Sequence, residues 1–317
     1  MTQLLSVVVP CYNESAVIEE THKKLLLALT KICQIFDLNF EVIYVNDGSK
    51  DDTLERLQRM AVSEGSRDKV KVLSLSRNFG HQLALSAGIE FAAGDAVVAI
   101  DADLQDPPEV MAQMVEKWKA GADVVYGVRR KRLGESWFKL ITAKMFYLTV
   151  RKLTRIDIPL DTGDFRLMSR QAVDVFVAMR ERHRFIRGMI PWIGFKQESV
   201  SYNRHPRFAG ETKYPLSKMM KLALDGITSF SNAPLQTAFV VGTLTALGAL
   251  AYAAFILIYA LVSGFPVEGW SSIMVVILFL GAVQLMSVGI LGEYIGRIYD
   301  EVKQRPLVII DKEKSVL

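Results

Sequence analysis

The stretch AVVAIDADLQDPP, residues 96–108, decides the fold. Its first five residues are all apolar, which is the length and composition of a strand buried on both faces of a sheet. The strand cannot continue through the proline pair, so Asp101, Asp103 and Asp106 lie at its C-terminal end. In open α/β sheets this edge is where ligands bind. The stretch therefore predicts a central strand whose end carries a binding loop.

The acids of this loop have two interpretations. Asp103 and Gln105 place oxygen ligands at alternate positions, a pattern that suits a hard divalent cation such as Mg²⁺ or Mn²⁺. Alternatively, the acids only begin a helix, because Asp106 before two prolines is a typical helix start signal. The spacing alone leaves metal binding and helix capping open.

Strands and helices alternate on both sides of this stretch. The interval between them is typical of a doubly wound parallel sheet, so we expect an α/β fold in which several strand ends share one edge. The predicted strands are 4–10, 41–46, 70–75, 96–100 and 123–127, and the predicted helices are 16–35, 53–60, 81–92 and 108–119.

Two more loops are predicted at the same edge, residues 10–14 after the first strand and 46–49 after the second. Taken singly, each loop is typical of a turn or a helix start. Together with the 101–106 loop they gather several carboxylates, which repel one another unless a cation or a ligand's donors compensate. The group therefore indicates a binding site. The first turn has no Gly-x-Gly-x-x-Gly, which disfavours a Rossmann dinucleotide site.

The apolar residues are concentrated in the last third of the 317 residues, of which 50% are hydrophobic. No charged residue occurs from 226 to 267, and 239–262 is nearly all apolar, whereas a bilayer span needs about 20 such residues. Residues 271–292 predict a second span ending at Glu293. Basic residues before the first span and after the second place both ends on the cytoplasmic side. Residues 216–230 predict a helix lying in the membrane interface.

The remaining composition excludes some classes of protein. The net charge of +4 is too small to argue for nucleic acid as a partner. Two cysteines without metal-ligand or redox spacing fit a reducing compartment. The N-terminus reads as a strand, and we expect no secretory signal. Small residues in the two spans permit close helix packing and predict a homo-oligomer.

Three segments resemble the family 2 glycosyltransferases of GT-A fold: VVPCYNE at 8–14, VNDGS at 45–49 and DADLQDP at 101–107. A fourth, SRNFGH at 76–81, is similar to the branch that glycosylates polyprenyl phosphates, which includes dolichyl-phosphate mannose synthases and bacterial bactoprenol glucosyltransferases. The resemblance covers residues 1 to 230, and the two spans match the bacterial members. It implies a cytosolic GT-A domain at 1–214, an interfacial helix at 215–232, two transmembrane helices at 233–298 and a cytosolic tail at 299–317.

The resemblance also implies a role for individual residues of the strand-edge loops. A nucleoside diphosphate is a poor leaving group unless a cation neutralises its growing charge. Asp103 and Gln105 would hold that Mg²⁺ or Mn²⁺, and Arg129 would clamp the diphosphate. The base and ribose would be held by Pro10, Tyr12, Glu14 and Asp47, with Asp101 completing that part of the site.

Asp157, Asp161 and Asp164 stand where members that glycosylate hydroxyls keep a catalytic base. A phosphate nucleophile is already ionised near neutral pH, because its second pKa is about 6. A strong base is therefore unnecessary, and we expect these acids to position the sugar or the acceptor. Asp164 has an alternative interpretation as a buried structural partner of Arg166.

Residues 202–214 resemble the loop that binds the acceptor phosphate in this family. The loop carries Arg204, Arg207 and Lys213, and the planar fork of arginine suits a phosphate because it donates two hydrogen bonds at once. A polybasic segment that only touches anionic lipid headgroups is the competing explanation. The Gly-Glu-Thr-Lys-Tyr sequence at 210–214 favours the specific role, since a lipid-surface role would not require it.

The expected activity is inverting, metal-dependent transfer of a hexose from a nucleotide sugar to a polyprenyl phosphate of undecaprenyl type. UDP-glucose is the favoured donor and GDP-mannose the alternative. Transfer to a polysaccharide or a lipid hydroxyl is disfavoured, because the chain lacks the Gln-x-x-Arg-Trp signature of processive synthases. A non-catalytic membrane subunit that only binds nucleotide is a further alternative. The expected location is a bacterial inner membrane, with the catalytic domain and both termini cytoplasmic.

Overall fold

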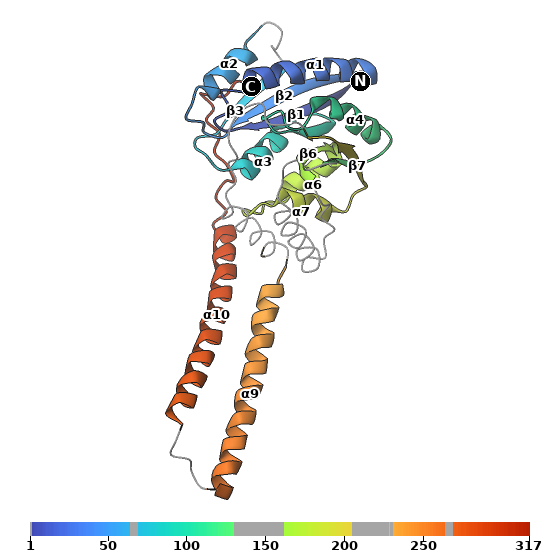
Figure 1. The fold of residues 1–317 in the computed structure, drawn as a ribbon. Coiled ribbons are helices and arrows are strands. Elements are labelled where there is room, and N and C mark those ends of the chain that lie inside the picture. Colours follow the sequence, from blue (N-terminus) through green and yellow to red (C-terminus); the bar gives the residue numbers. More distant parts are fainter. Residues whose placement is uncertain (1, 64–68, 130–161, 205–227, 229–230, 264–268) are drawn as a thin grey trace. The chain divides into compact units, whose positions relative to one another are not determined.

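A computed structural model describes residues 2–63, 69–129, 162–204, 228, 231–263 and 269–317. The chain divides into two compact units. The first comprises Met1–Ala223 together with Arg305–Leu317, and the second comprises Leu224–Gln304. Within the described residues, the first unit is built on a seven-stranded sheet and the second consists of two long helices (Figure 1). The last residues of the chain therefore belong with the sheet and not with the helices that precede them.

The sheet has the order β3-β2-β1-β4-β6-β5-β7. The strands β3, β2, β1 and β4 run parallel to one another, as do β5 and β7, whereas β6 is antiparallel to both β4 and β5. The expected α/β architecture is confirmed, but the expectation of a wholly parallel sheet is wrong. An antiparallel neighbour needs no helical crossover, so β6 lies outside the regular alternation. The strands are β1 Gln3–Cys11, β2 Leu38–Asn46, β3 Val70–Ser74, β4 Ala96–Ala99, β5 Val124–Arg129, β6 Thr162–Ser169 and β7 Gln197–Tyr202.

The helices Arg170–Ala178 and Ile186–Ile193 were not predicted. The four helices expected between residues 16 and 119 agree with the observed ones to within a few residues at each end. The exception is the helix expected from residue 108, which opens as a single 3₁₀ turn before the α-helix starts at Met111. The helices of this unit are α1 Ile18–Phe36, α2 Thr53–Ala61, α3 His81–Phe91, η1 Pro108–Val110, α4 Met111–Lys119, α6 Arg170–Ala178 and α7 Ile186–Ile193.

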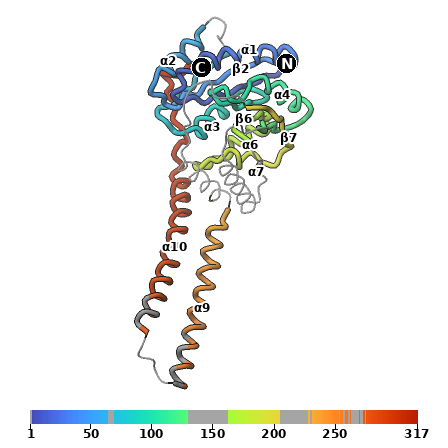
Figure 2. The backbone as a smooth tube through the Cα atoms, in the orientation of Figure 1, coloured from blue at the N-terminus to red at the C-terminus, as the bar shows by residue number. Residues whose placement is uncertain are grey.

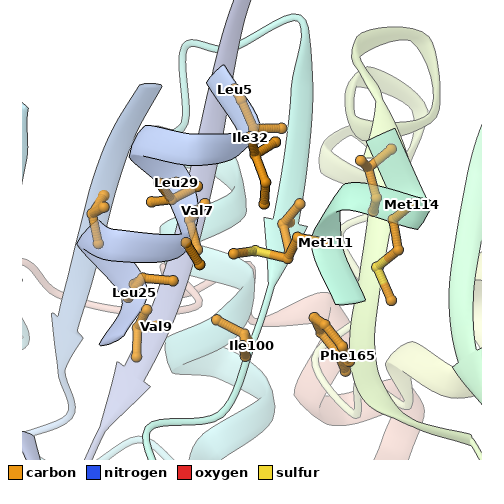
Figure 3. Packing of buried hydrophobic residues seen from close by; sticks show 14 of the residues in the cluster. Leu5, Val7, Val9, Leu25, Leu29, Ile32, Ile100, Met111, Met114 and Phe165 are labelled. Atoms are coloured by element: carbon orange, nitrogen blue, oxygen red, sulfur yellow. The ribbon is translucent and has the colours of Figure 1, made fainter. Parts of the chain in front are cut away.

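The core lies between the sheet and helices α1 and α4 (Figure 3). Alternate residues of β1 share one face of the sheet, and α1 presents side chains spaced three or four residues apart to that face. Truncating one such side chain to alanine costs about 2–5 kcal/mol. This core holds the end of β1 rigidly at the edge where the loops gather. Its labelled members are Leu5, Val7, Val9, Leu25, Leu29, Ile32, Ile100, Met111, Met114 and Phe165, each at most 5% exposed.

The C-terminal tail, residues 305–317, lies along the edge of β3 (Figure 2). Val72 and Val316 exchange both backbone hydrogen bonds, at 2.7 and 2.8 Å. The Asp311 N–H donates to Ser74 O at 2.8 Å, and the Ser76 N–H donates to Ile309 O at 2.9 Å. An uncovered edge strand is a template for unwanted pairing, and the tail protects this edge. The sequence predicted only a cytosolic tail and no pairing.

The second unit contains α9, Ala233–Ser263, and α10, Trp270–Val302. Both are long and apolar enough to cross a membrane by length and composition, over Ala233–Tyr252 and Val275–Val302. The helix α10 runs past Glu293, where the second span was expected to end. Glu293 instead accepts a hydrogen bond from Arg297 Nε at 3.0 Å, an i,i+4 pair that supports a helix. Except for Thr228, the interfacial helix predicted at 216–230 lies outside the described residues.

Candidate active site

Three loops meet at the carboxyl ends of β1, β2 and β4. Because β1 pairs in parallel with β2 and β4, these three ends lie next to one another. The Asp47 N–H donates to Cys11 O at 2.9 Å, and the Glu14 N–H donates to Thr53 Oγ1 at 2.9 Å. Thr21 Oγ1 donates to Ala102 O at 2.7 Å and ties α1 to the third loop. The structure thus brings together the loops that the sequence predicted at one edge.

Pro10, Tyr12 and Glu14, which the resemblance places around the nucleoside, lie at the first of these loops. Pro10 is buried in β1, whereas Tyr12 and Glu14 are half-buried in the loop that follows. The carbonyl oxygen of Glu14 accepts hydrogen bonds from Val17 and Ile18 at 3.0 Å, in the turn that leads into α1. The helix-start interpretation and the binding interpretation of Glu14 are therefore compatible.

Asp47 is buried, and its carboxylate holds the loop between β3 and α3. One oxygen accepts the N–H of Phe79 at 2.7 Å and the other accepts that of Gly80 at 2.9 Å. Burial raises the pKa of Asp47 despite these two hydrogen bonds. Gly48 has φ of 63°, and a Cβ there would lie 2.5 Å from the carbonyl carbon of Arg77. Asp47 and Gly48 together fix the position of this loop.

The loop after β4 brings Asp103, Gln105 and Arg204 together. Asp103 Oδ1 accepts the N–H of Gln105 at 3.2 Å, and Gln105 Oε1 accepts a hydrogen bond from Arg204 Nη2 at 2.5 Å. Leu104, between Asp103 and Gln105 in the sequence, has φ of 58°, a conformation that costs a non-glycine residue about 1–2 kcal/mol. Such strain is concentrated at functional sites. Arg204 was expected at the acceptor phosphate, yet its side chain contacts the loop assigned to the metal.

The oxygen atoms of Asp103 and Gln105 are donors of the kind that a hard divalent cation accepts. In the described part of the chain, no three His, Cys, Asp or Glu side chains are grouped closely enough to hold a metal ion. Magnesium is usually bound through one or two protein carboxylates, while phosphate oxygens and waters fill the other positions. One carboxylate and one amide oxygen at alternate positions match that donor set and would leave those positions to a diphosphate and to water.

Asp106 does not cap the following helix, so this prediction is wrong. The N-cap residue is Pro107, without a side-chain hydrogen bond, because the prolines remove N–H groups that a cap at Asp106 would bind. The Asp106 side chain is 1% exposed, accepts a hydrogen bond from the Tyr202 hydroxyl and lies 3.5 Å from Arg129 Nη2. A Cβ on Gly163 would lie 2.5 Å from the same nitrogen. Arg129 is therefore held in place and is not a solvated surface arginine.

Asp164 is the centre of a charged cluster. Its oxygens accept hydrogen bonds from Nε and Nη2 of Arg187, at 3.0 and 3.2 Å, and His81 Nε2 lies 3.2 Å away. Arg166, the expected structural partner, lies further away, at 3.8 Å. The same His81 nitrogen lies 3.6 Å from Asp101. His81 stood in a quoted motif without an assigned role, and Arg187 carried no sequence signal that linked it to Asp164.

Burial and the neighbouring charges shift the pKa values of His81, Asp164 and Asp101 in different directions. Burial by itself lowers the pKa of His81, but the hydrogen bond to Asp164 and the charges of Asp101 and Asp164 raise it to about 9. Burial favours a neutral Asp164, yet Arg187 and His81 hold its pKa well below the usual range. Burial and the neighbouring acids raise the pKa of Asp101 to about 6. Asp164 is therefore ionised and His81 is cationic at neutral pH.

Four other residues predicted for the site, Asp157, Asp161, Arg207 and Lys213, lie outside the described residues.

Comparison with known proteins places the chain in a family. Residues 6–176 match the family described as "Glycosyl transferase family 2". The chain is 48% identical over 311 residues to the "Uncharacterized glycosyltransferase YkcC" of Bacillus subtilis (strain 168), covering 98% of this chain and 94% of the relative. It is 43% identical over 311 residues to the "Bactoprenol glucosyl transferase" of Shigella phage SfV, covering 98% and 99%.

Among solved structures, the mannosyltransferase PcManGT from Pyrobaculum calidifontis, in complex with GDP-Man and Mn²⁺, matches 91% of this chain and 88% of its own, with a TM-score of 0.46 and 18% identity. The family match covers more than half of the 317 residues, and the curated relatives are similar over nearly the whole chain. The chain therefore belongs to glycosyl transferase family 2, and it is similar along its length to bactoprenol glucosyl transferases.

Proposed function

We propose that this chain transfers glucose from UDP-glucose to a polyprenyl phosphate of undecaprenyl type, with inversion, at the cytoplasmic face of a membrane. The observation that carries the proposal is the contact between Gln105 and Arg204, which puts a guanidinium beside the oxygen ligands of the Asp101–Asp106 loop. A cation site with an adjacent arginine suits a diphosphate leaving group. The full-length similarity to a bactoprenol glucosyl transferase supports the choice of sugar and lipid.

On the donor side, we assign Pro10, Tyr12, Glu14, Asp47 and Asp101 to the nucleoside. Asp47 would act by holding the loop at residues 77–80, because both its oxygens bind backbone N–H groups there. This loop would then form part of the nucleoside site.

Asp103 and Gln105 would hold Mg²⁺ or Mn²⁺, and the bound cation would neutralise charge on the departing diphosphate. We assign Arg129 and Arg204 to the same diphosphate, Arg204 because it contacts Gln105. This differs from the sequence expectation for Arg204, which was the acceptor phosphate. Arg207 and Lys213 keep that acceptor role as proposals.

The chemistry proposed is a displacement at the anomeric carbon. A bond forms between that carbon and an oxygen of the lipid phosphate, while the bond to the β-phosphate oxygen breaks and UDP leaves. The phosphate is largely ionised near neutral pH, so no proton has to be removed. Asp164 is unsuited to act as a base, since it is ionised but its oxygens are engaged by Arg187 and His81. Asp157 and Asp161 remain candidates for positioning the sugar or the acceptor.

The two long helices support a membrane location for the acceptor. Large apolar side chains of α9 and α10, such as Phe239, Leu250 and Leu285, are mostly exposed, as expected for surfaces that face lipid. The basic residues that flank the helices in the sequence support a topology in which both ends are cytoplasmic. The homo-oligomer expected from the small residues of these helices stays a prediction.

The test is transfer from a panel of nucleotide sugars to undecaprenyl phosphate by the full chain in detergent, followed by mass spectrometry of the lipid. We expect UDP-glucose to give a lipid-linked hexose only with a divalent cation present, and Asp103→Asn to reduce transfer at least a hundredfold. Glu109→Gln, at an exposed position of the same segment, is the matched control. Transfer from GDP-mannose instead would establish the alternative donor. Nucleotide binding without any transfer would establish a non-catalytic subunit.

A further inference from the structure

Four elements place two cations and two carboxylates together beside the Asp103 loop. His81 is the first residue of α3, Asp101 follows β4, Asp164 lies in β6 and Arg187 lies in α7. Asp101 is two residues before Asp103. The function proposed above assigns Asp101 to the nucleoside and gives His81 and Arg187 no role, although Asp101 links His81 to the loop that is assigned to the diphosphate.

Asp164 lies beneath the other three members of the cluster. Its side chain is 5% exposed, whereas those of His81, Arg187 and Asp101 are 35, 27 and 30% exposed. Gln82 makes the support more rigid, since its amide nitrogen donates to Asp164 at 3.3 Å and its amide oxygen accepts the N–H of Ile186 at 3.1 Å. The two cations are thus fixed from within the protein and keep part of their surface open to solvent.

The charge balance of the cluster indicates which ligand it suits. His81 and Arg187 each face a carboxylate, so their charges are compensated and they attract a phosphate less than uncompensated arginines would. A third cation, Arg166, lies 3.8 Å from Asp164 but is only 5% exposed. A sugar hydroxyl is both a donor and an acceptor, so it can accept from imidazolium or guanidinium and donate to a carboxylate. The cluster therefore suits a neutral polyhydroxy ligand better than an anion.

We propose that His81 and Arg187, positioned by Asp164, bind hydroxyl groups of the donor hexose together with Asp101 and determine which hexose is accepted. The inference rests on the proposed function, because it assumes that a nucleotide sugar binds at the neighbouring loop. A site that hydrogen-bonds a hydroxyl discriminates strongly against analogues that cannot match it, since its polar groups are then left unpaired. Loss of one such partner should therefore reduce the preference among epimers.

The experiment compares binding of UDP-glucose, UDP-galactose and UDP to the full chain by calorimetry, without acceptor. UDP-galactose differs only at one hydroxyl, and UDP lacks the hexose, so the base and diphosphate contacts stay constant. For His81→Gln and Arg187→Gln we expect the preference of UDP-glucose over UDP-galactose to fall about tenfold, with UDP affinity unchanged. Arg180→Gln, an exposed ion pair with Glu90, is the control. Thermal unfolding of each variant verifies folding.

The binding readout separates this inference from the proposed function. If the variants keep the wild-type preference, or the wild type does not distinguish the two epimers, the inference is overturned whether or not transfer occurs. If the preference collapses while UDP affinity stays constant, the inference holds. In that case, an absence of transfer to undecaprenyl phosphate would count against the proposed function alone.

Discussion

Gly48→Ala is expected to disable nucleotide binding through its effect on the loop at residues 77–80. Gly48 has φ of 63°, and alanine in that conformation costs about 1–2 kcal/mol. Its Cβ would lie 2.5 Å from Arg77 C and 2.6 Å from Asn78 N, so the backbone there must move. That movement pulls the N–H groups of Phe79 and Gly80 away from Asp47, whose hydrogen bonds measure 2.7 and 2.9 Å.

The expected loss of stability combines these effects. A hydrogen bond to a charged group contributes about 1.5–3 kcal/mol, so weakening the pair at Asp47 and adding the strain gives roughly 2–5 kcal/mol. Chemical denaturation and UDP binding measure the two consequences. Gly121→Ala is the matched control, because Gly121 also has a positive φ, of 93°, but its Cβ would meet nothing within 4 Å. The control should lose only about 1–2 kcal/mol and keep its UDP affinity.

Equal stability and equal UDP affinity in the two alanine variants would refute this reasoning. That result would mean that the contact between residue 48 and the following loop relaxes without disturbing Asp47.

Three further predictions concern the tail, the arginine and the histidine. Removing residues 309–317 should speed amide exchange at Val72 and Ser76 and lower the denaturation midpoint, whereas removing Leu317 alone should not; unchanged exchange would contradict the pairing on β3. Arg204→Ala should raise the KM for nucleotide sugar more than that for lipid phosphate, and the reverse order would return Arg204 to the acceptor. The pKa of His81 is raised to about 9, so its stabilisation is complete below about pH 6.5 and is lost as pH rises through 9. His81→Gln should remove about 1–2 kcal/mol of that pH dependence, reduced for partial exposure, and an unchanged profile between pH 6.5 and 9.5 would refute this.

The fold was predictable wherever a buried strand and an amphipathic helix alternate. Local sequence patterns predict these elements. The apolar run that contains Val7 and Val9 indicates β1, and the four-residue spacing of Leu25 and Leu29 indicates α1. The antiparallel strand β6 was not predicted. Its pairing with β4 and β5 depends on the arrangement of the whole sheet, and its own residues do not indicate it. The tail on β3 was missed for the same reason, since it adds only two isolated bridges to the edge.

For the candidate site, the sequence predicted where the loops lie. It did not predict which residues their side chains contact. Asp106 has the local signature of a helix cap, yet its carboxylate binds Tyr202, 96 residues away. Asp164 was paired with Arg166 by proximity in sequence, whereas Arg187 and His81 lie closer to its oxygens. A side-chain contact across such distances has no periodic signal, so no pattern in the chain could indicate it.

By itself, the sequence determined the α/β alternation, the three loops at one sheet edge, the two apolar helices and the motifs of family 2. These features are local, because burial, turn chemistry and span length act on neighbouring residues. Only the tertiary structure decided that Arg204 meets Gln105, that Asp106 holds Arg129 and that Asp164 gathers His81 with Arg187. Buried charges must find partners, and the folded backbone alone determines which of them come within reach.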